Sequence, residues 1–243
     1  MSDRIYGIHA VRELIDADPA RIRSLKVAAG RRAPELAAIV ARARNASIRV
    51  DSVERSALNR LAGGGSHQGI LAECHAVRPA SEAAFEERFA TLSRPLLLAL
   101  DHIEDPRNLG ACLRSAEAAG VDAVLVPRRR SAPLSGVAAK AASGAMEHLT
   151  IVEVANLARR LEWLRDRGVW VVGGDADGDV AYTDVPFDGA IAIVVGSEGK
   201  GLRRLTRERC DFLARIPLAG KVASLNVSVA TSILLFEAVR QRG

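Results

Sequence analysis

The sequence predicts an α/β fold whose larger, C-terminal part is built on a parallel sheet. From residue 96 onward, continuous apolar segments such as Leu96–Leu100 and Ile191–Val195 alternate with segments of helical periodicity. Uninterrupted apolar strands are typical of a parallel sheet that helices cover on both faces. A polar stretch at residues 78–94 precedes this pattern and indicates a separate, smaller α/β domain before it.

Residues 1–77 are expected to form the smaller domain. Apolar residues recur at helical spacing in Gly7–Ala17, and Pro34 with Glu35 is a typical helix start. We predict helices at Gly7–Ala17, at Pro34–Ala43 and from an Asp51 or Ser52 cap to Leu61, strands at Leu25–Val27, Ile48–Val50 and Gly69–Cys74, and a flexible loop at Gly63–Ser66.

Residues 78–94 are rich in Ala and Glu, with a proline near each end, and are predicted to be a partly helical linker. The catalytic domain is then expected at residues 95–243. We predict its strands at Leu96–Leu100, Asp122–Val126, His148–Val152, Val169–Val172, Ile191–Val195 and Phe212–Ile216, and its helices at Asn108–Ala119, Ser135–Ala142, Asn156–Arg167 and from Ser224–Asn226 to Arg240.

The charge distribution indicates a weak preference for a polyanionic partner. The chain carries 34 basic and 29 acidic residues, and residues 1–77 hold 12 of the former and 8 of the latter. Most of the net charge of +5 therefore lies in the first third. A cluster of basic residues there is either an RNA-docking patch or an ordinary solvent-exposed face: Arg21, Arg23, Lys26, Arg31 and Arg32.

The three cysteines and five histidines have no spacing typical of a metal site or a disulfide framework. We therefore expect no metal, and reduced thiols in a cytoplasmic protein. The N-terminal residues lack the apolar segment of a signal peptide, and the longest uncharged apolar stretch, Val222–Phe236, is too short and too polar to span a bilayer.

Three motifs follow predicted strands and carry the residues suited to chemistry. Residues 105–114, DPRNLGACLR, follow the first strand of the larger domain, and Asn108 there can cap a helix. Residues 196–201, GSEGKG, have three glycines that let backbone approach a ligand, but they match neither a P-loop nor a GxGxxG fingerprint. Residues 216–226 end in Ser224-Leu225-Asn226, at the start of the last helix.

Together these motifs resemble the SpoU/TrmH family of the SPOUT superfamily, the RNA 2′-O-ribose methyltransferases. The segments DPRNLGACLRSAEAAG, VVGSEGKGL and IPLAGKVASLNVSVATSILLFE occur in the family's order, and VPRRRSAPLSGVAAKAASGAMEHL is also similar. The N-terminal YGIHAVREL and GGGSHQGILAE resemble the L30e/L7Ae-like substrate-binding domain of the branch that methylates guanosine in large-subunit (23S) rRNA.

The resemblance implies a C-terminal domain with a deep trefoil knot, S-adenosyl-L-methionine as cofactor, a homodimer and large-subunit rRNA as partner. It implies cofactor-binding roles for Gly196, Ile216 and Leu225. The catalytic positions that it implies are Asn108, Arg114, Glu198, Ser224 and Asn226. The departures are small, with Leu218 where methionine is common and Thr231-Ser232 where small residues are common.

Methyl transfer to a ribose hydroxyl needs alignment and a means to polarise the hydroxyl, and Arg114 is the family's proposed activator. A guanidinium has a pKa above ~12, so we expect Arg114 to stabilise developing alkoxide charge and to hold a phosphate rather than to act as a base. The alternatives are a sibling enzyme that acts on another rRNA or tRNA nucleotide, and a non-catalytic assembly factor that binds rRNA. A nucleotide- or dinucleotide-binding α/β enzyme is disfavoured because the chain lacks GxGxxG and a Walker lysine.

Overall fold

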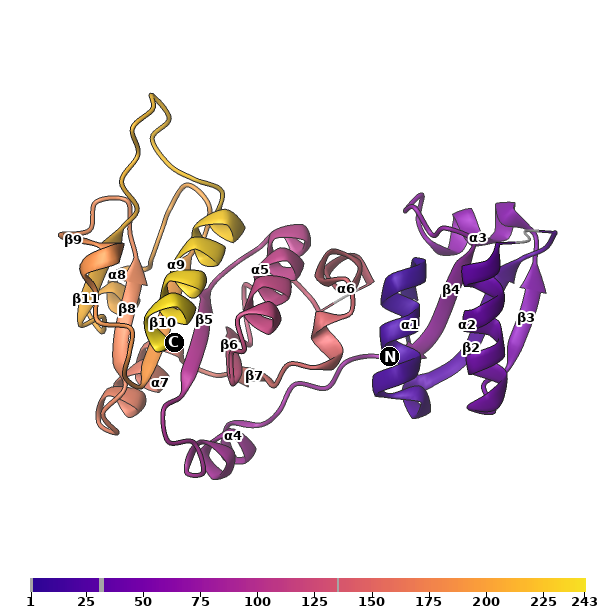
Figure 1. Cartoon of the computed structure of the whole chain (residues 1–243), viewed down its shortest axis with the longest axis horizontal. Coiled ribbons are helices and arrows are strands. Elements are labelled where there is room, and N and C mark those ends of the chain that lie inside the picture. Colours follow the sequence, from indigo (N-terminus) through magenta and orange to yellow (C-terminus); the bar gives the residue numbers. More distant parts are fainter. Residues whose placement is uncertain (1, 31–32, 135) are drawn as a thin grey trace. The chain divides into compact units, whose positions relative to one another are not determined.

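The computed structural model describes residues 2–30, 33–134 and 136–243. It separates into two compact units, which are residues 1–78 with 133–148, and residues 79–132 with 149–243. The first contains α6, so a segment that lies far along the sequence packs with the N-terminal strands. Figure 1 labels the elements of both units.

The first unit is built on a mixed four-stranded sheet with strand order β1-β4-β2-β3. β4 pairs antiparallel with β1 and β2, and β2 pairs parallel with β3. Its elements are β1 Ser2–Tyr6, α1 Ile8–Ala17, β2 Ile22–Ala28, α2 Pro34–Asn45, β3 Val50–Val53, α3 Arg55–Leu61, β4 Ile70–His75 and α6 Gly136–Ala142.

The second unit is built on a seven-stranded sheet with order β7-β6-β5-β10-β8-β11-β9, and each of its pairs is parallel. This confirms the predicted α/β class with a parallel sheet. Its elements are α4 Glu82–Phe89, β5 Leu96–Asp101, α5 Pro106–Ala118, β6 Ala123–Pro127, β7 Ile151–Val154, α7 Leu157–Arg165, β8 Trp170–Gly174, β9 Val180–Ala181, β10 Ile191–Gly196, α8 Arg204–Arg207, β11 Phe212–Arg215 and α9 Val227–Arg242.

Helices cover both faces of the larger sheet. Alternate strand residues form one core cluster with α4 and α7, in which Phe85 and Leu161 are fully buried. The opposite face carries α5 and α9, which pack against each other and, through α9, against β8 and β10 (Figure 1). The side chain of Leu234 on α9 lies so close to Gly174 that a Cβ there would approach it to 2.9 Å.

The residues predicted as a linker, 78–94, include an ordered helix that belongs to the second unit. Ser81 caps α4 by accepting a hydrogen bond from the Ala84 amide. The Arg160 guanidinium donates to the carboxylates of Glu82 and Glu86 on this helix. Burial alone would raise the pKa of Glu82, but the Ala155 amide and Arg160 outweigh it and hold that pKa below its ordinary value.

Two predicted helix caps are wrong. Asp105, not Asn108, caps α5 by accepting from the Arg107 amide at 2.8 Å, and Pro106 takes the first helical position. Asp51 and Ser52 lie within β3, and α3 begins after Glu54 without a side-chain cap. An aspartate directly before a proline is the stronger helix start, and it leaves the Asn108 side chain available for another contact.

The three cysteines are free, and their thiols are expected to be unreactive in the folded chain. Burial raises the pKa of Cys74 and Cys112 to about 11 and that of Cys210 to about 12. At about pH 8, a thiol with a pKa of 11 reacts on the order of 10²-fold more slowly than an unfolded one, since only the thiolate attacks. Ellman's reagent should therefore label the native chain slowly and the denatured chain fully, and one native thiol that reacts at the denatured rate would contradict this burial.

Candidate functional site

The site lies where the order of strands in the larger sheet reverses, at the carboxyl ends of β5 and β10. The two strands are adjacent, and Gly196 at the end of β10 pairs with Asp101 at the end of β5. The loops after them therefore leave the sheet side by side, which is the usual place for a ligand in an α/β sheet. The Asp101 carboxylate, 1% exposed, joins these loops by accepting from the Arg203 amide at 2.8 Å and by a 2.5 Å contact with His102 Nδ1.

Three predicted catalytic residues meet in one hydrogen-bonded cluster. Glu198 Oε1 accepts from Asn108 Nδ2 at 2.7 Å and from Asn226 Nδ2 at 2.8 Å. Asn226 Nδ2 also donates to Asn108 Oδ1 at 3.1 Å. The cluster thus joins α5, the loop after β10 and the start of α9.

The start of α9 fixes the orientation of the Asn226 amide. Asn226 caps this helix, and its Oδ1 accepts from the Ser228 amide at 2.9 Å and from the Ser228 hydroxyl at 2.6 Å. The Nδ2 group must therefore face Glu198, since the oxygen is committed to the helix. Asn226 therefore both caps the helix and takes part in the cluster.

The loop 197–201 turns tightly because of its glycines. The amides and carbonyls of Ser197 and Gly201 bond each other, at 2.9 and 3.1 Å. Gly199 and Gly201 have φ values of +74° and +62°, which favour glycine. A Cβ on Gly196 would lie 2.1 Å from the Gly201 carbonyl carbon and oxygen, so only glycine permits the strand and the loop to approach this closely.

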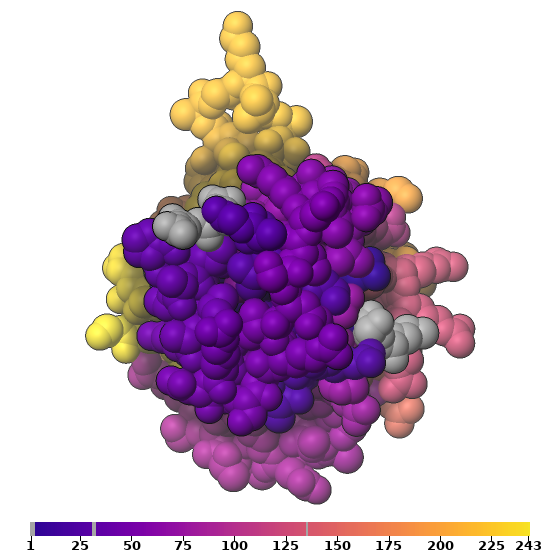
Figure 2. Space-filling view, turned by 90° about the vertical axis from the view of Figure 1, so that its right-hand side faces the viewer, coloured from indigo at the N-terminus to yellow at the C-terminus, as the bar shows by residue number. Residues whose placement is uncertain are grey.

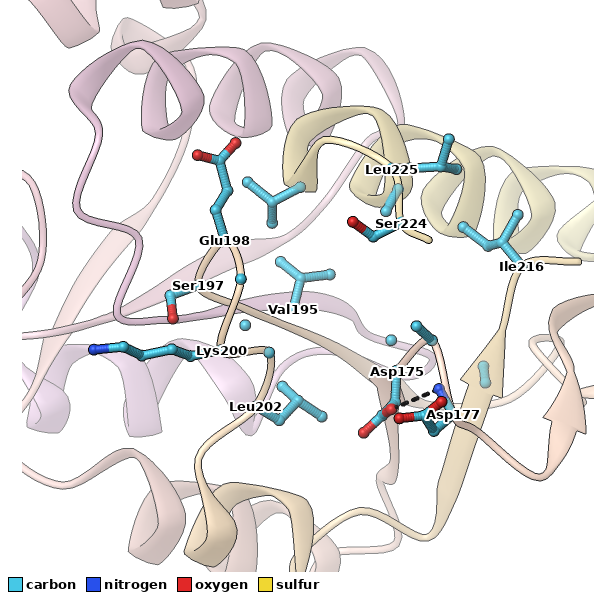
Figure 3. A pocket seen from close by; sticks show the side chains of 18 of the residues that line it. Asp175, Asp177, Val195, Ser197, Glu198, Lys200, Leu202, Ile216, Ser224 and Leu225 are labelled. Atoms are coloured by element: carbon cyan, nitrogen blue, oxygen red, sulfur yellow. Dashed lines mark hydrogen bonds between the residues drawn. The ribbon is translucent and has the colours of Figure 1, made fainter. Parts of the chain in front are cut away.

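A cavity of about 450 Å³ opens beside this loop (Figure 3). Five predicted site residues line it: Gly196, Glu198, Ile216, Ser224 and Leu225. Lys200 of the predicted glycine loop also lines it, and so do three charged residues that were not predicted, namely Asp175, Asp177 and Arg207. The acidic pair follows β8, so an aspartate after a buried strand was the available signal, as it was for Asp101.

The charged groups of the cavity are distributed towards its two ends. Glu198 lies at one end, near the start of α9, and Asp175 and Asp177 lie at the other (Figure 3). The Arg207 guanidinium donates to Asp175 at 2.9 Å. This hydrogen bond to Asp175, together with the negative charge of the Asp175 carboxylate, raises the pKa of Arg207 above its ordinary value.

Arg114 lies outside this cavity. It is exposed on α5, and it does not belong to the set of described residues that line the cavity. Six residues separate it from Asn108, which corresponds to about 120° around a helix, so the two side chains leave α5 in different directions. The structure therefore brings together Asn108, Glu198, Ser224 and Asn226 but not Arg114.

Replacing Glu198 tests whether the cluster acts through orientation or charge. Glutamine keeps a carbonyl oxygen that can accept from both asparagines, whereas alanine leaves both without this partner. We expect Glu198→Ala to lower the turnover of the methyl transfer that the sequence resemblance implies, on the order of 10²-fold, because Asn108 and Asn226 would be misplaced. Glu198→Gln should keep most of the normal turnover. Steady-state kinetics on both variants measures this, and equal losses in the two would assign the effect to the charge instead.

Within residues 2–30, 33–134 and 136–243, no group of three or more His, Cys, Asp or Glu side chains is placed to hold a metal ion. In the same residues, each helix is too short or too polar to cross a bilayer.

Comparison with known proteins finds a matching family for each of the two parts of the chain. Residues 95–236 match the SpoU rRNA Methylase family, and residues 4–80 match the family described as RNA 2′-O ribose methyltransferase substrate binding. The chain is 47% identical over 243 residues to the 23S rRNA (guanosine-2′-O-)-methyltransferase RlmB of Yersinia pestis, covering 100% of this chain and 99% of that protein.

Solved structures share the fold. The SpoU methyltransferase AviRb from Streptomyces viridochromogenes superposes with a TM-score of 0.82 at 22% identity, over 99% of this chain and 90% of that one. The AdoMet-bound rRNA methyltransferase from Sinorhizobium meliloti superposes with a TM-score of 0.77 at 27% identity, over 98% and 87% of the two chains. The match over more than half of the sequence and the full-length relative give one conclusion: the chain belongs to the SpoU rRNA methylase family and carries that family's RNA substrate-binding domain at its N-terminus.

Proposed function

We propose that the chain is an S-adenosyl-L-methionine-dependent enzyme that methylates the ribose 2′-hydroxyl of a guanosine in large-subunit (23S) rRNA. The observation that carries this proposal is the 47% identity to a protein of that activity over both units. The polar cluster of Asn108, Glu198 and Asn226 beside the cavity supports catalysis over a binding role alone, because it places hydrogen-bonding side chains where a substrate hydroxyl could reach them.

The cavity fits the proposed cofactor in size and charge. A volume of about 450 Å³ lies in the range of small-molecule sites. Three carboxylates line it, those of Asp175, Asp177 and Glu198, together with the cations Lys200 and Arg207, of which Arg207 is paired with Asp175. Groups of both signs suit a ligand that carries sulfonium and ammonium cations as well as a carboxylate. The close approach of Gly196 and Gly201 lets backbone groups lie against that ligand. We propose that Gly196, Ile216 and Leu225 contact the cofactor.

In this proposal the site residues position the ribose. When bound, the cofactor would supply an electrophilic methyl group to the ribose 2′-oxygen, in exchange for its bond to sulfur, and the hydroxyl proton would pass to solvent water. Asn108, Ser224 and Asn226 would orient the nucleotide, and Glu198 would fix both asparagines and the glycine loop. Arg114 would stabilise the developing charge on the 2′-oxygen and hold a phosphate by a bidentate contact.

We further propose a homodimer, a cytoplasmic location and a trefoil knot, as the sequence resemblance implies. Val229, Phe236 and Val239 are large apolar residues exposed on α9, and a second copy would cover them. An Arg114 outside the chain's own cavity fits an assembly in which it reaches the partner's substrate. The return of α9 to β8, β10 and α5 supports the knot.

Labelled S-adenosyl-L-methionine and unmodified 23S rRNA test the function. We expect one 2′-O-methylated guanosine, located by the resistance of its 3′ phosphodiester bond to alkaline cleavage. Label in tRNA, or at another rRNA nucleotide, would indicate a sibling activity. If the chain binds the cofactor but transfers no methyl group to naked rRNA or to an assembling ribosomal particle, the proposed enzymatic activity is contradicted. That result would favour a non-catalytic assembly factor.

A further inference from the structure

Two members of the basic cluster at which RNA docking was expected, Arg21 and Lys26, are paired with carboxylates. The Arg21 guanidinium lies 2.5 Å from the Glu147 carboxylate, with side chains only 12% and 4% exposed. Lys26 Nζ lies 3.4 Å from Glu73 and 3.8 Å from Asp51. Arg23 is exposed, and residues 31–32 lie outside the described part of the chain. A polyanion would have to displace carboxylates to bind Arg21 and Lys26.

A different group of cations lies near the loop Gly63–Ser66 of the same unit. Figure 2 shows the N-terminal residues of this unit, coloured indigo to purple, facing the viewer. Lys140 on α6 donates to the Ser66 carbonyl at 3.0 Å, and its Nζ lies 5.2 Å from the centre of the Tyr6 ring. A Cβ on Gly65 would lie 2.5 Å from the Tyr6 hydroxyl, so the loop rests directly on that ring. These contacts place the lysine ammonium beside the loop.

Two arginines approach the same loop from its other end. Arg4 Nη1 donates to the carbonyl of Leu61, the last residue of α3, at 3.3 Å. Arg60 is exposed in the last turn of that helix, and the Gly63 amide donates to its carbonyl at 3.2 Å. Lys140 thus contacts the last residue of the loop, Arg4 contacts the end of α3 just before it, and Arg60 lies three positions before Gly63. We call these three residues the loop-63 patch.

The patch keeps its positive charge. Within the described residues, no ion pair joins Arg4, Arg60 or Lys140 to a carboxylate, and the polar partners of Arg4 and Lys140 are neutral carbonyls. The acidic residues nearest in sequence are Asp3, whose carboxylate accepts from the Arg4 amide, and Glu54, at the other end of α3. The amides of residues 63–65 donate to carbonyls at the end of α3, so these three amides are not available to an anion.

The surroundings of the patch favour a polyanion over a protein or a lipid surface. In the part of this unit that the structure describes, Val137 alone is an exposed large hydrophobic residue. A membrane or a protein partner would require more apolar area. Three cations beside one loop are instead suited to successive phosphates of a nucleic-acid backbone.

We propose that the loop-63 patch holds the phosphate backbone of the RNA substrate, with Lys140 supplied by a segment outside the sequence matched to the substrate-binding family. This inference rests on the proposed function for the identity of the RNA. It assigns RNA docking to Arg4, Arg60 and Lys140. Arg21 and Lys26 instead stabilise the fold through their ion pairs.

A triple substitution of the full-length chain, Arg4→Gln, Arg60→Gln and Lys140→Gln, tests the patch. We expect the KM for a 23S rRNA fragment to rise about tenfold at about 0.15 M salt, with kcat and the cofactor Kd unchanged. The slope of log K against log salt should fall by about 2, because about 0.7 to 0.9 counterions are released for each phosphate neutralised. The charge-keeping triple, Arg4→Lys, Arg60→Lys and Lys140→Arg, should retain the normal KM and slope.

The matched control removes three other positive charges from the same unit, by Arg23→Gln, Arg44→Gln and Arg78→Gln. These arginines are exposed and have no carboxylate partner among the described residues. An equal change of KM and slope in the two triples would overturn the patch, since only net charge would then matter. Binding of the same RNA is measured in parallel by filter binding. If the unsubstituted chain binds this RNA but does not methylate it, the proposed function is refuted. The binding constants of the two triple variants then still show whether the patch contacts the RNA.

Discussion

Replacing Arg114 with alanine is expected to lower kcat for RNA methylation on the order of 10²–10³-fold, the usual cost of removing a donor that stabilises developing oxyanion charge. The stability of the fold should change little, because the side chain is exposed on α5 and does not line the cavity. Single-turnover methylation at saturating cofactor measures the effect, with isothermal titration of the cofactor as the control. A normal kcat with a raised KM would restrict Arg114 to RNA binding.

Arg114→Lys separates the charge from the shape of the guanidinium. Lysine keeps the cation but not the planar fork that binds a phosphate through two bonds. We expect turnover between those of the alanine variant and the normal chain, and near-normal turnover would contradict the bidentate contact.

Mixing Arg114→Ala with Glu198→Ala chains tests the proposed dimer. If Arg114 serves the partner's cavity, a mixed dimer contains one intact site. Its activity should then be about half that of the normal dimer, which has two. Both single variants alone should stay nearly inactive. No recovery in the mixture, with mixed dimers confirmed by tag pull-down, would assign Arg114 to its own chain's substrate.

The sequence was sufficient for the fold class because the strands of the larger sheet are buried on both faces. Ile191–Val195 and Leu96–Leu100 are apolar without interruption, and both form central strands. The grouping of Asn108, Glu198 and Asn226 was also within reach, since each follows a strand or begins a helix at the same sheet edge. The hydrogen bonds among these three side chains could not be predicted from the sequence, because they depend on which side chain caps each helix.

Other features required tertiary structure. β1 is a strand because Ile5 and Tyr6 are buried against β4, yet the segment SDRIY has no continuous apolar run. The packing of α6 against β1 depends on Gly136, where a Cβ would lie 2.0 Å from the Arg4 carbonyl oxygen. Arg21 and Glu147 are 126 positions apart in the sequence, which likewise gave no signal for their ion pair. The boundaries 1–77, 78–94 and 95–243 remain a prediction, and residues 133–148 cluster with the first unit.

Gly196→Ala is expected to weaken cofactor binding at least about a hundredfold, or about 2.8 kcal/mol. The new Cβ would lie 2.1 Å from the Gly201 carbonyl group and 2.4 Å from the Leu202 amide nitrogen. These are backbone atoms that cannot rotate away, so the loop 197–201 must move from β10. That movement would break the paired bonds between Ser197 and Gly201 and displace Glu198 from Asn108 and Asn226.

Gly189→Ala is the matched control, because a Cβ at Gly189 would meet no atom within 4 Å. It should bind the cofactor normally, as measured by isothermal titration, while thermal melting reports whether Gly196→Ala remains folded. A folded Gly196→Ala chain with normal affinity would show that the loop can leave β10 without loss of the ligand site. The cofactor would then depend on Ile216 and Leu225 rather than on the closure of the glycine loop, and the cavity would be formed chiefly by the segment that leads into α9.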